Sequence, residues 1–586
     1  MGGERGLCRR SHGLHARDRD PGGKGECEWR GLRAWPSYRR LGKPDHRHPA
    51  ERARDARPEA GHRRHLYRRR RGHSHRDRAR LTMAMQAGST VLADAGKAGR
   101  EAAIAVIDIG SNSIRLVIYA SGGRYPFPLF NERSNCRLGE GLGEDGMLQA
   151  DRIQVALAAM ARFAGIMKAM GVTTIHAVAT AAVRRARNAA EFTGPAEAII
   201  GQPIEVLSQD EEAHFVSQGL TLNIPEATGF VADLGGGSLE VVKLERGVAQ
   251  HSTSFNFGHL STVTADDLRN AFDSTPWLAG DSSTRIFGVG GSFRALGLAY
   301  IEQTGYPLPV LHGLRIPGDE AANLLSAFCR ESPDLSGVPL GRQKTMPTAA
   351  LIMLGLFRRC GGGRITVSGT SIRDGLIADR ELAAGDRADF LQVVCQEISR
   401  ASHRFPGVPE ALVDLLRPLF RPRRDADDAS VSVDRARFER LLEVACYLSD
   451  MCWTEHEDVR GDLGARRVLG LPVNCVTHKE RIWLATAVYH RYVGRKTNKS
   501  RPPELGFILS RRRRAEATTI GLGLRFALTF SGGTAQDLRK MRMSHDGKVL
   551  TLHVDPSCAS LVDSHARRRF QQLAQSANLV PRIVGA

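Results

Sequence analysis

Several features that would place the chain in a special class are missing from its sequence. The ten cysteines are scattered, with no C-x-x-C pair and no spacing of Cys and His that suits a metal. This distribution argues against a zinc site and a disulfide framework, and it suits a reducing cytoplasm. No window holds 18 uninterrupted apolar residues, so no membrane-spanning helix is expected. The N-terminus also lacks the apolar core of a secretory signal.

Positive charge is in excess, but it is unevenly placed. The chain of 586 residues has a formal net charge of +20, yet residues 1–80 alone contain 24 Lys and Arg against 10 Asp and Glu. The remaining residues carry 59 Lys and Arg against 53 Asp and Glu, so that part is only mildly basic. A chain of this length is too long for one hydrophobic core, and we expect three or four domains.

Residues 1–98 are rich in Arg, Gly, His and Pro and show almost no periodic apolar pattern. Such a composition buries too little apolar surface to offset the entropy of ordering, so we expect a disordered Arg-rich extension. One alternative is a basic arm that binds nucleic acid or polyphosphate. Another is an upstream extension that is not translated, because Met83 and Met85 precede the first expected strand and would serve as starts.

The most informative stretch is Phe230–Glu240, which reads F-V-A-D-L-G-G-G-S-L-E. It predicts a strand, a tight glycine turn and a second strand. Three glycines lack the Cβ atoms that would keep an anion from backbone N–H groups, so Gly235, Gly236, Gly237 and Ser238 could hold a phosphate. Asp233 and Glu240 flank the turn and could hold a hydrated divalent cation. The alternative is an ordinary glycine-rich hairpin.

A second copy of this pattern lies 125 positions upstream, in Ile104–Tyr119. A strand ends in Asp108, the turn Gly110–Ser113 follows, and another strand leaves. Two such hairpins predict two similar halves that face each other across a phosphate. In that arrangement the N–H groups of Ser111, Asn112 and Ser113 oppose the second turn, and Asp108 is a third candidate for the cation.

These hairpins resemble the phosphate loops of the actin, sugar kinase and Hsp70 superfamily, and more closely those of the Ppx/GppA family of exopolyphosphatases and guanosine-pentaphosphate phosphatases. The resemblance covers about residues 100–500 well and residues 506–586 faintly. It implies an α/β fold with two actin-like (ribonuclease H-like) lobes, an all-α HD-like domain and a small α+β C-terminal domain. The expected ranges are 1–98 for the extension, 99–215 and 216–385 for the lobes, 386–505 for the helical domain and 506–586 for the last domain.

The resemblance also assigns residues in lobe I. The family pattern A-T-x-A-x-R falls on Ala179–Arg184, so Thr180 and Arg184 are expected to position the terminal phosphate, at the start of a helix expected over Thr180–Phe192. Ser208 and Glu211 fit a capping box, which leaves Glu212 free to point elsewhere. In the family the second glutamate of this E-E-A motif is the proposed catalytic base, and Glu212 stands at that position.

Lobe II contains two further motifs. The strand expected over Arg285–Gly291 ends in G-V-G-G, and Ser292 could cap the helix Phe293–Gln303. This resembles the superfamily's third glycine motif, although a helix cap with close packing would account for it equally. The segment Ile365–Asp379 resembles the closing part of the second lobe, and its Arg373 is a candidate phosphate ligand.

The last 200 residues have a different pattern. Apolar residues at helical spacing predict helices over Phe390–His403, Phe438–Trp453 and Ile482–Tyr492. Within residues 386–505 no histidine, including His456, His478 and His490, is followed by Asp, so we expect this helical domain to be metal-free. Its expected use is a basic wall for a long polyanion, formed by Arg481, His490, Arg491, Arg495, Lys496 and Lys499. Beyond it we expect a strand at Lys548–Val554, a helix near Ala566–Ala577 and turn chemistry at His545-Asp546.

The resemblance implies Mg²⁺-assisted hydrolysis of the terminal phosphoanhydride bond of inorganic polyphosphate, with Glu212 activating water. Conversion of guanosine pentaphosphate to tetraphosphate is the alternative, followed by a superfamily kinase and by a polyanion binder without catalysis. We expect no stable nucleic-acid partner and a cytoplasmic location, and a homodimer is left open. Truncation of residues 1–82 separates the classes, since a binder would lose its function and a hydrolase would keep it.

Overall fold

The computed structural model describes residues 103–120, 127–142, 146–330, 333–382, 389–402, 406–422, 427–494, 505 and 508–585. The expectations for residues 1–98, for the two alternative starts, and for Arg495, Lys496 and Lys499 lie outside these ranges.

Lobe I is built on a five-stranded sheet of order β3-β2-β1-β4-β5, in which β2 is antiparallel to β1 and β4 is parallel to it. Alternate residues of β1 face opposite sides. Ile107 packs with α3 and α5, whereas Val106 packs with α6. The elements are β1 Ala103–Ile109, β2 Ile114–Ala120, β3 Pro128–Ser134, α3 Ala150–Ala169, β4 Val172–Ala179, α4 Ala181–Arg185, α5 Ala189–Ile200, β5 Ile204–Val206 and α6 Gln209–Asn223.

Lobe II repeats the hairpin in a six-stranded sheet of order β10-β11-β9-β6-β7-β8. The β6–β7 pair is antiparallel and β9 is parallel to β6, as β4 is to β1 in lobe I. The elements are β6 Gly229–Leu234, β7 Leu239–Glu245, β8 Val248–Phe255, α7 Ala265–Asp273, η2 Pro276–Leu278, β9 Arg285–Val289, α8 Gly290–Thr304, β10 Leu314–Pro317, α9 Gly318–Phe328, α10 Leu340–Gln343, α11 Met346–Arg359, β11 Arg364–Val367 and α12 Ile372–Arg380.

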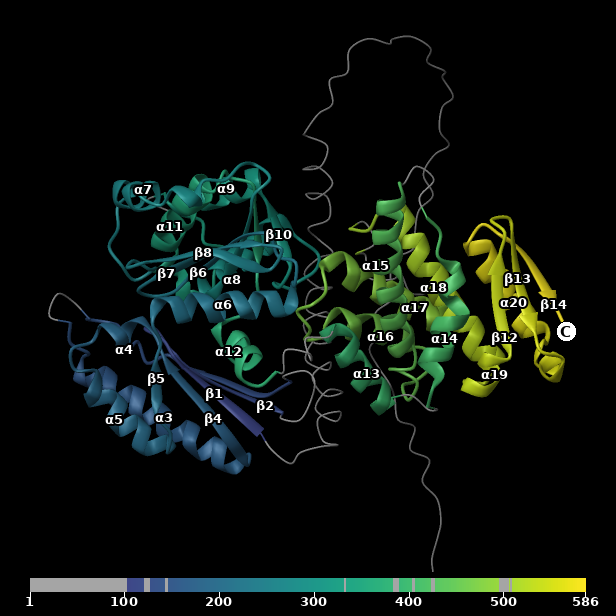
Figure 1. Ribbon diagram of the computed structural model, residues 1–586, viewed down its shortest axis with the longest axis horizontal. Helices are drawn as coiled ribbons and strands as arrows, with labels where there is room; N and C mark the ends of the chain where they lie inside the picture. The colour runs from purple at the N-terminus through teal and green to yellow at the C-terminus, as the bar shows by residue number, and fades with distance from the viewer. Residues whose placement is uncertain are drawn as a thin grey trace, which may run out of the picture. The chain divides into compact units, whose positions relative to one another are not determined.

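Helices α6 and α12 lie between the two sheets and join the lobes (Figure 1). One buried cluster combines Val106 of β1, Phe215 of α6, Val231 of β6 and Leu376 of α12. The helices cross closely because Gly375 carries no side chain. A Cβ there would overlap the carbonyl of Phe215. The boundary expected at residues 215/216 therefore falls inside α6, and the division into domains stays a prediction.

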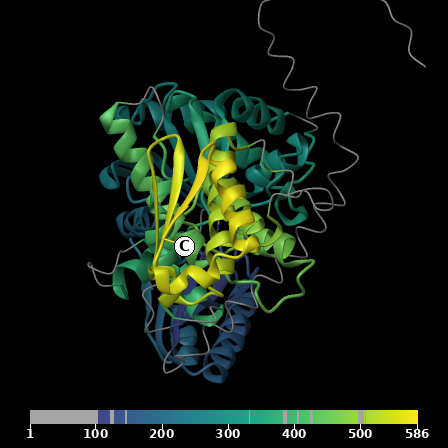
Figure 2. The same ribbon diagram turned by 90° about the vertical axis from the view of Figure 1, so that its right-hand side faces the viewer.

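The remaining chain forms helices followed by a small sheet of order β12-β13-β14, and one hydrophobic cluster runs through both parts. The C-terminal strands and α20 are yellow in Figure 2. The elements are α13 Phe390–Ser402, α14 Val408–Leu416, η3 Arg417–Leu419, α15 Asp428–Tyr447, α16 Arg460–Leu469, α17 His478–Val493, α18 Arg511–Phe530, α19 Ala535–Arg539, β12 Met541–His545, β13 Val549–Val554, η4 Pro556–Leu561, α20 Ser564–Ser576 and β14 Val580–Val584. None of the helices in the described ranges has both the length and the apolar character needed to cross a membrane.

Two sequence expectations about helix ends are wrong. The helix expected over Thr180–Phe192 is two helices, α4 and α5, with a break at residues 186–188. Helix α8 begins at Gly290, so Ser292 lies inside its first turn and does not cap it. Ser292 is instead buried, with its hydroxyl 3.5 Å from Nδ1 of His259.

The expected basic wall is also wrong for the residues that can be placed. The Arg481 guanidinium is buried and donates to the carbonyl groups of Val468, Leu469, Leu471 and Val473. Likewise Arg491 is buried against Asp450, at 2.9 Å, and His490 contacts the carbonyl of Gly494. Helical spacing did not reveal that these polar groups point inward and satisfy loop carbonyls.

The turn chemistry expected at His545-Asp546 is present. The backbone N–H of Lys548 donates to the Asp546 carboxylate at 2.8 Å, and that of Gly547 donates to Nδ1 of His545 at 3.2 Å.

Candidate active site

The two glycine turns have the same local geometry. The N–H of Gly110 donates to the carbonyl of Ser113 at 3.1 Å, and that of Gly235 donates to the carbonyl of Ser238 at 3.0 Å. The strand register is equivalent too, since Asp108 stands opposite Arg115 and Asp233 stands opposite Glu240. The hairpins are thus structural copies. They differ at one position, where lobe II has Glu240 and lobe I has Arg115.

The turns meet. A Cβ built on Gly236 would lie 3.2 Å from the Cβ of Ser111, which belongs to the other lobe. Each turn is held from behind by a backbone hydrogen bond. Gly139 donates to the carbonyl of Ser111 at 2.8 Å, and Leu260 donates to that of Gly236 at 2.9 Å. The sequence predicted this opposition.

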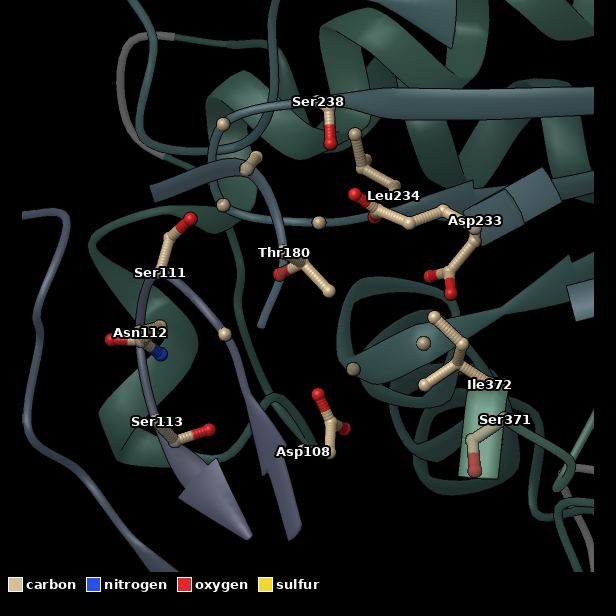
Figure 3. Close-up of a pocket in the computed structure, with 18 of the residues that line it drawn as sticks. Asp108, Ser111, Asn112, Ser113, Thr180, Asp233, Leu234, Ser238, Ser371 and Ile372 are labelled. Carbon is tan, nitrogen blue, oxygen red and sulfur yellow. The ribbon is translucent and has the colours of Figure 1, made fainter. Parts of the chain in front are cut away.

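A cavity lies where the turns meet, and Figure 3 shows the carboxylates of Asp108 and Asp233 entering the same space from the two hairpins. All the predicted site residues except Arg184 line this cavity. They are Asp108, Ser111, Asn112, Ser113, Thr180, Glu212, Asp233, Gly235, Gly236, Gly237, Ser238 and Glu240.

Unused donors surround the cavity. Within the described ranges, the N–H groups of Ser111, Asn112, Gly236 and Gly237 make no backbone hydrogen bond. The N-terminus of α8 contributes Gly290 and Gly291, without a capping side chain. Convergent N–H groups and the positive end of a helix both favour an anion such as phosphate.

The two adjacent glutamates of α6 have different environments. Glu211 completes the capping box with Ser208, whereas Glu212 is buried and lines the cavity. Arg184 donates to the Glu212 carboxylate and to the carbonyl of Leu207, at 2.6 Å for the latter. Arg184 therefore orients Glu212 instead of lining the phosphate cavity. Burial raises the pKa of Glu212 to about 7, although the bond from Arg184 lowers it.

Asp233, which is half-buried, and Glu240, which is buried, stand opposite each other on β6 and β7 and form an acidic pair. Burial raises the pKa of Asp233 to about 6 and that of Glu240 to about 8, the latter also because of its acidic neighbours Glu212 and Asp233. The Ser254 hydroxyl donates to Glu240 at 3.3 Å. A Cβ on Gly290, which has φ +86°, would overlap the Asp233 carboxylate, so this glycine lets the acid reach the cavity.

A divalent cation fits the acidic pair better than it fits Asp108. Asp108 is already paired with Arg373, which is buried in the first turn of α12. Across the described residues, no three His, Cys, Asp or Glu side chains form a complete ligand set. Mg²⁺ does not need one, because it usually keeps several waters and binds one or two carboxylates together with phosphate oxygens.

Sequence reasoning missed most of the arginines. The cavity is also lined by Arg115, Arg133, Arg294 and Arg342, and by Arg373, which was only weakly supported. Arg115 was detectable, because it occupies the place in the first hairpin that Glu240 occupies in the second. The other three come from segments with no pattern in common.

Two family models match this chain. The model of the Ppx/GppA phosphatase family matches residues 100–275, and the model of the exopolyphosphatase C-terminal domain matches residues 429–582. The chain belongs to the Ppx/GppA family. The first match contains both glycine turns, Arg184, Glu212 and the acidic pair.

The chain is also similar to a curated relative and to solved structures. The chain is 26% identical over 292 residues to the guanosine-5'-triphosphate,3'-diphosphate pyrophosphatase of Vibrio cholerae. This alignment covers 47% of the chain and only 58% of the relative. A crystal structure of the Aquifex aeolicus Ppx/GppA family member is 23% identical, with a TM-score of 0.42, covering 47% of this chain and 97% of that one. An exopolyphosphatase from Cytophaga hutchinsonii is 22% identical, with a TM-score of 0.43 and the same coverage.

Proposed function

We propose that the protein hydrolyses terminal phosphoanhydride bonds of inorganic polyphosphate and releases phosphate. One observation carries this proposal. The glycine turns of opposite lobes meet at Ser111 and Gly236, beside the buried carboxylate of Glu212. The free N–H groups of both turns would hold the terminal phosphate, and Thr180 at the cavity wall would help to position it.

Glu212 would act as the general base. A carboxylate with a pKa near 7 can accept a proton from water at neutral pH, and Arg184 fixes its orientation. The lobes on either side of the cavity would exclude bulk water from the bond that breaks.

The acidic pair would hold Mg²⁺ or another divalent cation. Glu240 is buried, Asp233 is half-buried, and both have raised pKa values, so a bound cation would stabilise their ionised forms. When bound, the ion would neutralise phosphate oxygens as charge moves to the leaving group. Asp108 would stay on Arg373 and contribute through water at most.

Guanosine pentaphosphate is the second candidate substrate, because the curated relative from Vibrio cholerae is named for it. The two reactions share a terminal phosphate, a phosphoanhydride bond and the same loops. The match to an exopolyphosphatase C-terminal model favours inorganic polyphosphate. A superfamily kinase and a polyanion binder without catalysis are less suited to a buried Glu212 beside the phosphate turns.

The wider assignments are proposals as well. The helical segment from Phe390 onward would correspond to the HD-like domain, and the chain would act in the cytoplasm, alone or as a homodimer, without nucleic acid. Truncation of residues 1–82 should leave phosphate release intact, because the proposed site lies wholly in the lobes.

The deciding experiment measures phosphate release from polyphosphate, guanosine pentaphosphate and ATP in parallel, with and without Mg²⁺. We expect Mg²⁺-dependent release from polyphosphate at the highest kcat/KM. Release from none of the three would overturn the proposal, and a higher kcat/KM for guanosine pentaphosphate would select the alternative.

A further inference from the structure

Three arginines around the cavity have no carboxylate partner among the residues that the structure describes. They are Arg133 of β3, Arg294 in the second turn of α8 and Arg342 of α10. The other cavity arginines have partners, since Arg373 is paired with Asp108 and Arg115 donates to Asn131 at 2.8 Å. The unpaired charges therefore come from both lobes and face one space.

Arg342 has the most unusual position of the three. Its guanidinium lies directly against Gly291, so that a Cβ on Gly291 would overlap it. The group thus sits at the N-terminus of α8, where the helix dipole is positive and a cation is unfavourable. Its Nη1 atom is buried without a hydrogen-bond partner in the described structure.

The three charges are close enough to act on one another. Burial lowers the pKa of Arg342 to about 10, Arg133 and Arg294 lower it further, and the charge of Asp233 opposes them. Burial likewise lowers the pKa of His259 to about 4, and Arg342 and Arg133 add to the effect. A cluster of like charges at a helix N-terminus is stabilised by an anion, and the free N–H groups of the turns lie in the same cavity.

We propose that Arg133, Arg294 and Arg342 form a subsite for the phosphates that follow the terminal one. The inference rests on the proposed function, because the terminal phosphate must occupy the two turns. The ligand chemistry is a chain of at least two further phosphoanhydride-linked phosphates. Inorganic polyphosphate and the 5'-triphosphate of a nucleotide both supply it, so the experiment includes a probe for each.

The test measures binding in a Glu212→Gln background, which slows turnover by about two to four orders of magnitude. The Kd values of orthophosphate, inorganic tripolyphosphate and guanosine 5'-triphosphate are determined by calorimetry with Mg²⁺ present. We expect Arg294→Gln and Arg342→Gln each to raise the tripolyphosphate Kd about ten- to hundredfold, the scale of a lost charge-assisted hydrogen bond. The orthophosphate Kd should not change. A parallel loss for the nucleotide would show that both sources use the subsite, and a loss confined to tripolyphosphate would restrict it to inorganic chains.

Two controls separate recognition from folding. Arg187→Gln removes an exposed cation that lines neither the cavity nor the turns, and it should leave every Kd unchanged. Without ligand, Arg342→Gln should keep or raise the Tm, because it removes from a helix N-terminus a half-buried cation whose Nη1 atom has no hydrogen-bond partner in the described structure. Arg342→Lys should recover part of the affinity, because lysine keeps the positive charge but lacks the planar guanidinium that binds a phosphate through two hydrogen bonds.

The inference fails if the arginine variants bind tripolyphosphate like the parent, or if they lose orthophosphate affinity to the same extent. These outcomes do not depend on turnover. A wild-type protein that released no phosphate would overturn the proposed function, whereas unchanged tripolyphosphate binding in an active enzyme would overturn the subsite alone.

Discussion

Adjacent side chains of this protein have different environments and different contacts, as Glu211 and Glu212 show. Glu211 accepts from the backbone N–H of Ser208 at 2.7 Å and closes a helix cap, whereas Glu212 is buried in the cavity beside Arg184. Arg184 and Arg185 divide in the same way, because Arg185 is exposed while Arg184 orients the carboxylate.

Replacing Glu212 by Gln should lower kcat by about two to four orders of magnitude, the usual contribution of a general base. Tripolyphosphate binding should survive, because the turns and arginines that hold the phosphates are untouched. Glu211→Gln is the matched control, since glutamine still serves in a capping box and should keep full turnover. Comparable phosphate release by Glu212→Gln and the wild type would exclude Glu212 as the base.

Replacing Arg184 by Met should move the pH dependence of kcat/KM. The base must be ionised, so activity should rise with pH through the pKa of Glu212, which is about 7 without ligand. The hydrogen bond and the charge of Arg184 both lower that pKa, so their loss should raise it and shift the ascending limb to higher pH. An unchanged limb with a lower rate would indicate that Arg184 contacts the phosphate instead.

At the scale of elements, the crossing of α6 and α12 fixes the relation between the two hairpins. Its short separation depends on Gly219 and Gly375, where a Cβ would meet backbone atoms of the other helix. Arg373, which pairs with Asp108, projects from the same first turn of α12. A change in the geometry of this crossing would therefore displace Arg373, and with it the ion pair to Asp108 in the cavity.

Gly375→Ala should cost more than about 3 kcal/mol of unfolding free energy, because the new methyl group overlaps the Phe215 carbonyl. The matched control is Gly165→Ala in α3, where a Cβ meets nothing within 4 Å. That change should stabilise the protein by about 0.5–1 kcal/mol, the usual helix preference for Ala over Gly. Urea unfolding of both variants measures their free energies of unfolding. Similar values would mean that α6 and α12 do not pack as closely as the structure shows.

For the whole molecule, the buried acids make ligand-free stability depend on pH. Glu212 and Glu240 have pKa values raised to about 7 and about 8, so the folded protein holds protons that the unfolded chain has already released. Their contribution to stability is present at low pH and is lost as pH rises through the folded pKa values.

We therefore expect the Tm of the metal-free protein to fall between about pH 4.5, the ordinary pKa of these carboxyls, and about pH 8, the folded pKa of Glu240, and we expect Mg²⁺ to flatten this decline by pairing with the carboxylates. Differential scanning calorimetry with EDTA or Mg²⁺, at matched ionic strength, measures both slopes. In the Glu240→Gln variant, the Tm of the metal-free protein should fall less as the pH rises. Parallel declines with and without Mg²⁺ would argue against a cation at Asp233 and Glu240.

How much could be predicted differs between the parts of the chain. The two hairpins were predictable because their turns are local, and Gly110–Ser113 and Gly235–Ser238 form the hydrogen bonds that such sequences favour. The capping box at Ser208 is local too. The burial of Arg481 and Arg491 was not predictable, because their partners are carbonyls and a carboxylate from other segments.

The amino-acid sequence by itself determined the strand–turn–strand units, their internal repetition and the capping role of Glu211, since these depend on neighbours within a few residues. Only the tertiary structure decided that Arg184 orients Glu212, that Arg373 holds Asp108, and that Arg133, Arg294 and Arg342 share one cavity. Those pairings join side chains as many as 265 positions apart. Charge interactions act through space, so the partner of a buried ion is chosen by packing and not by distance along the chain.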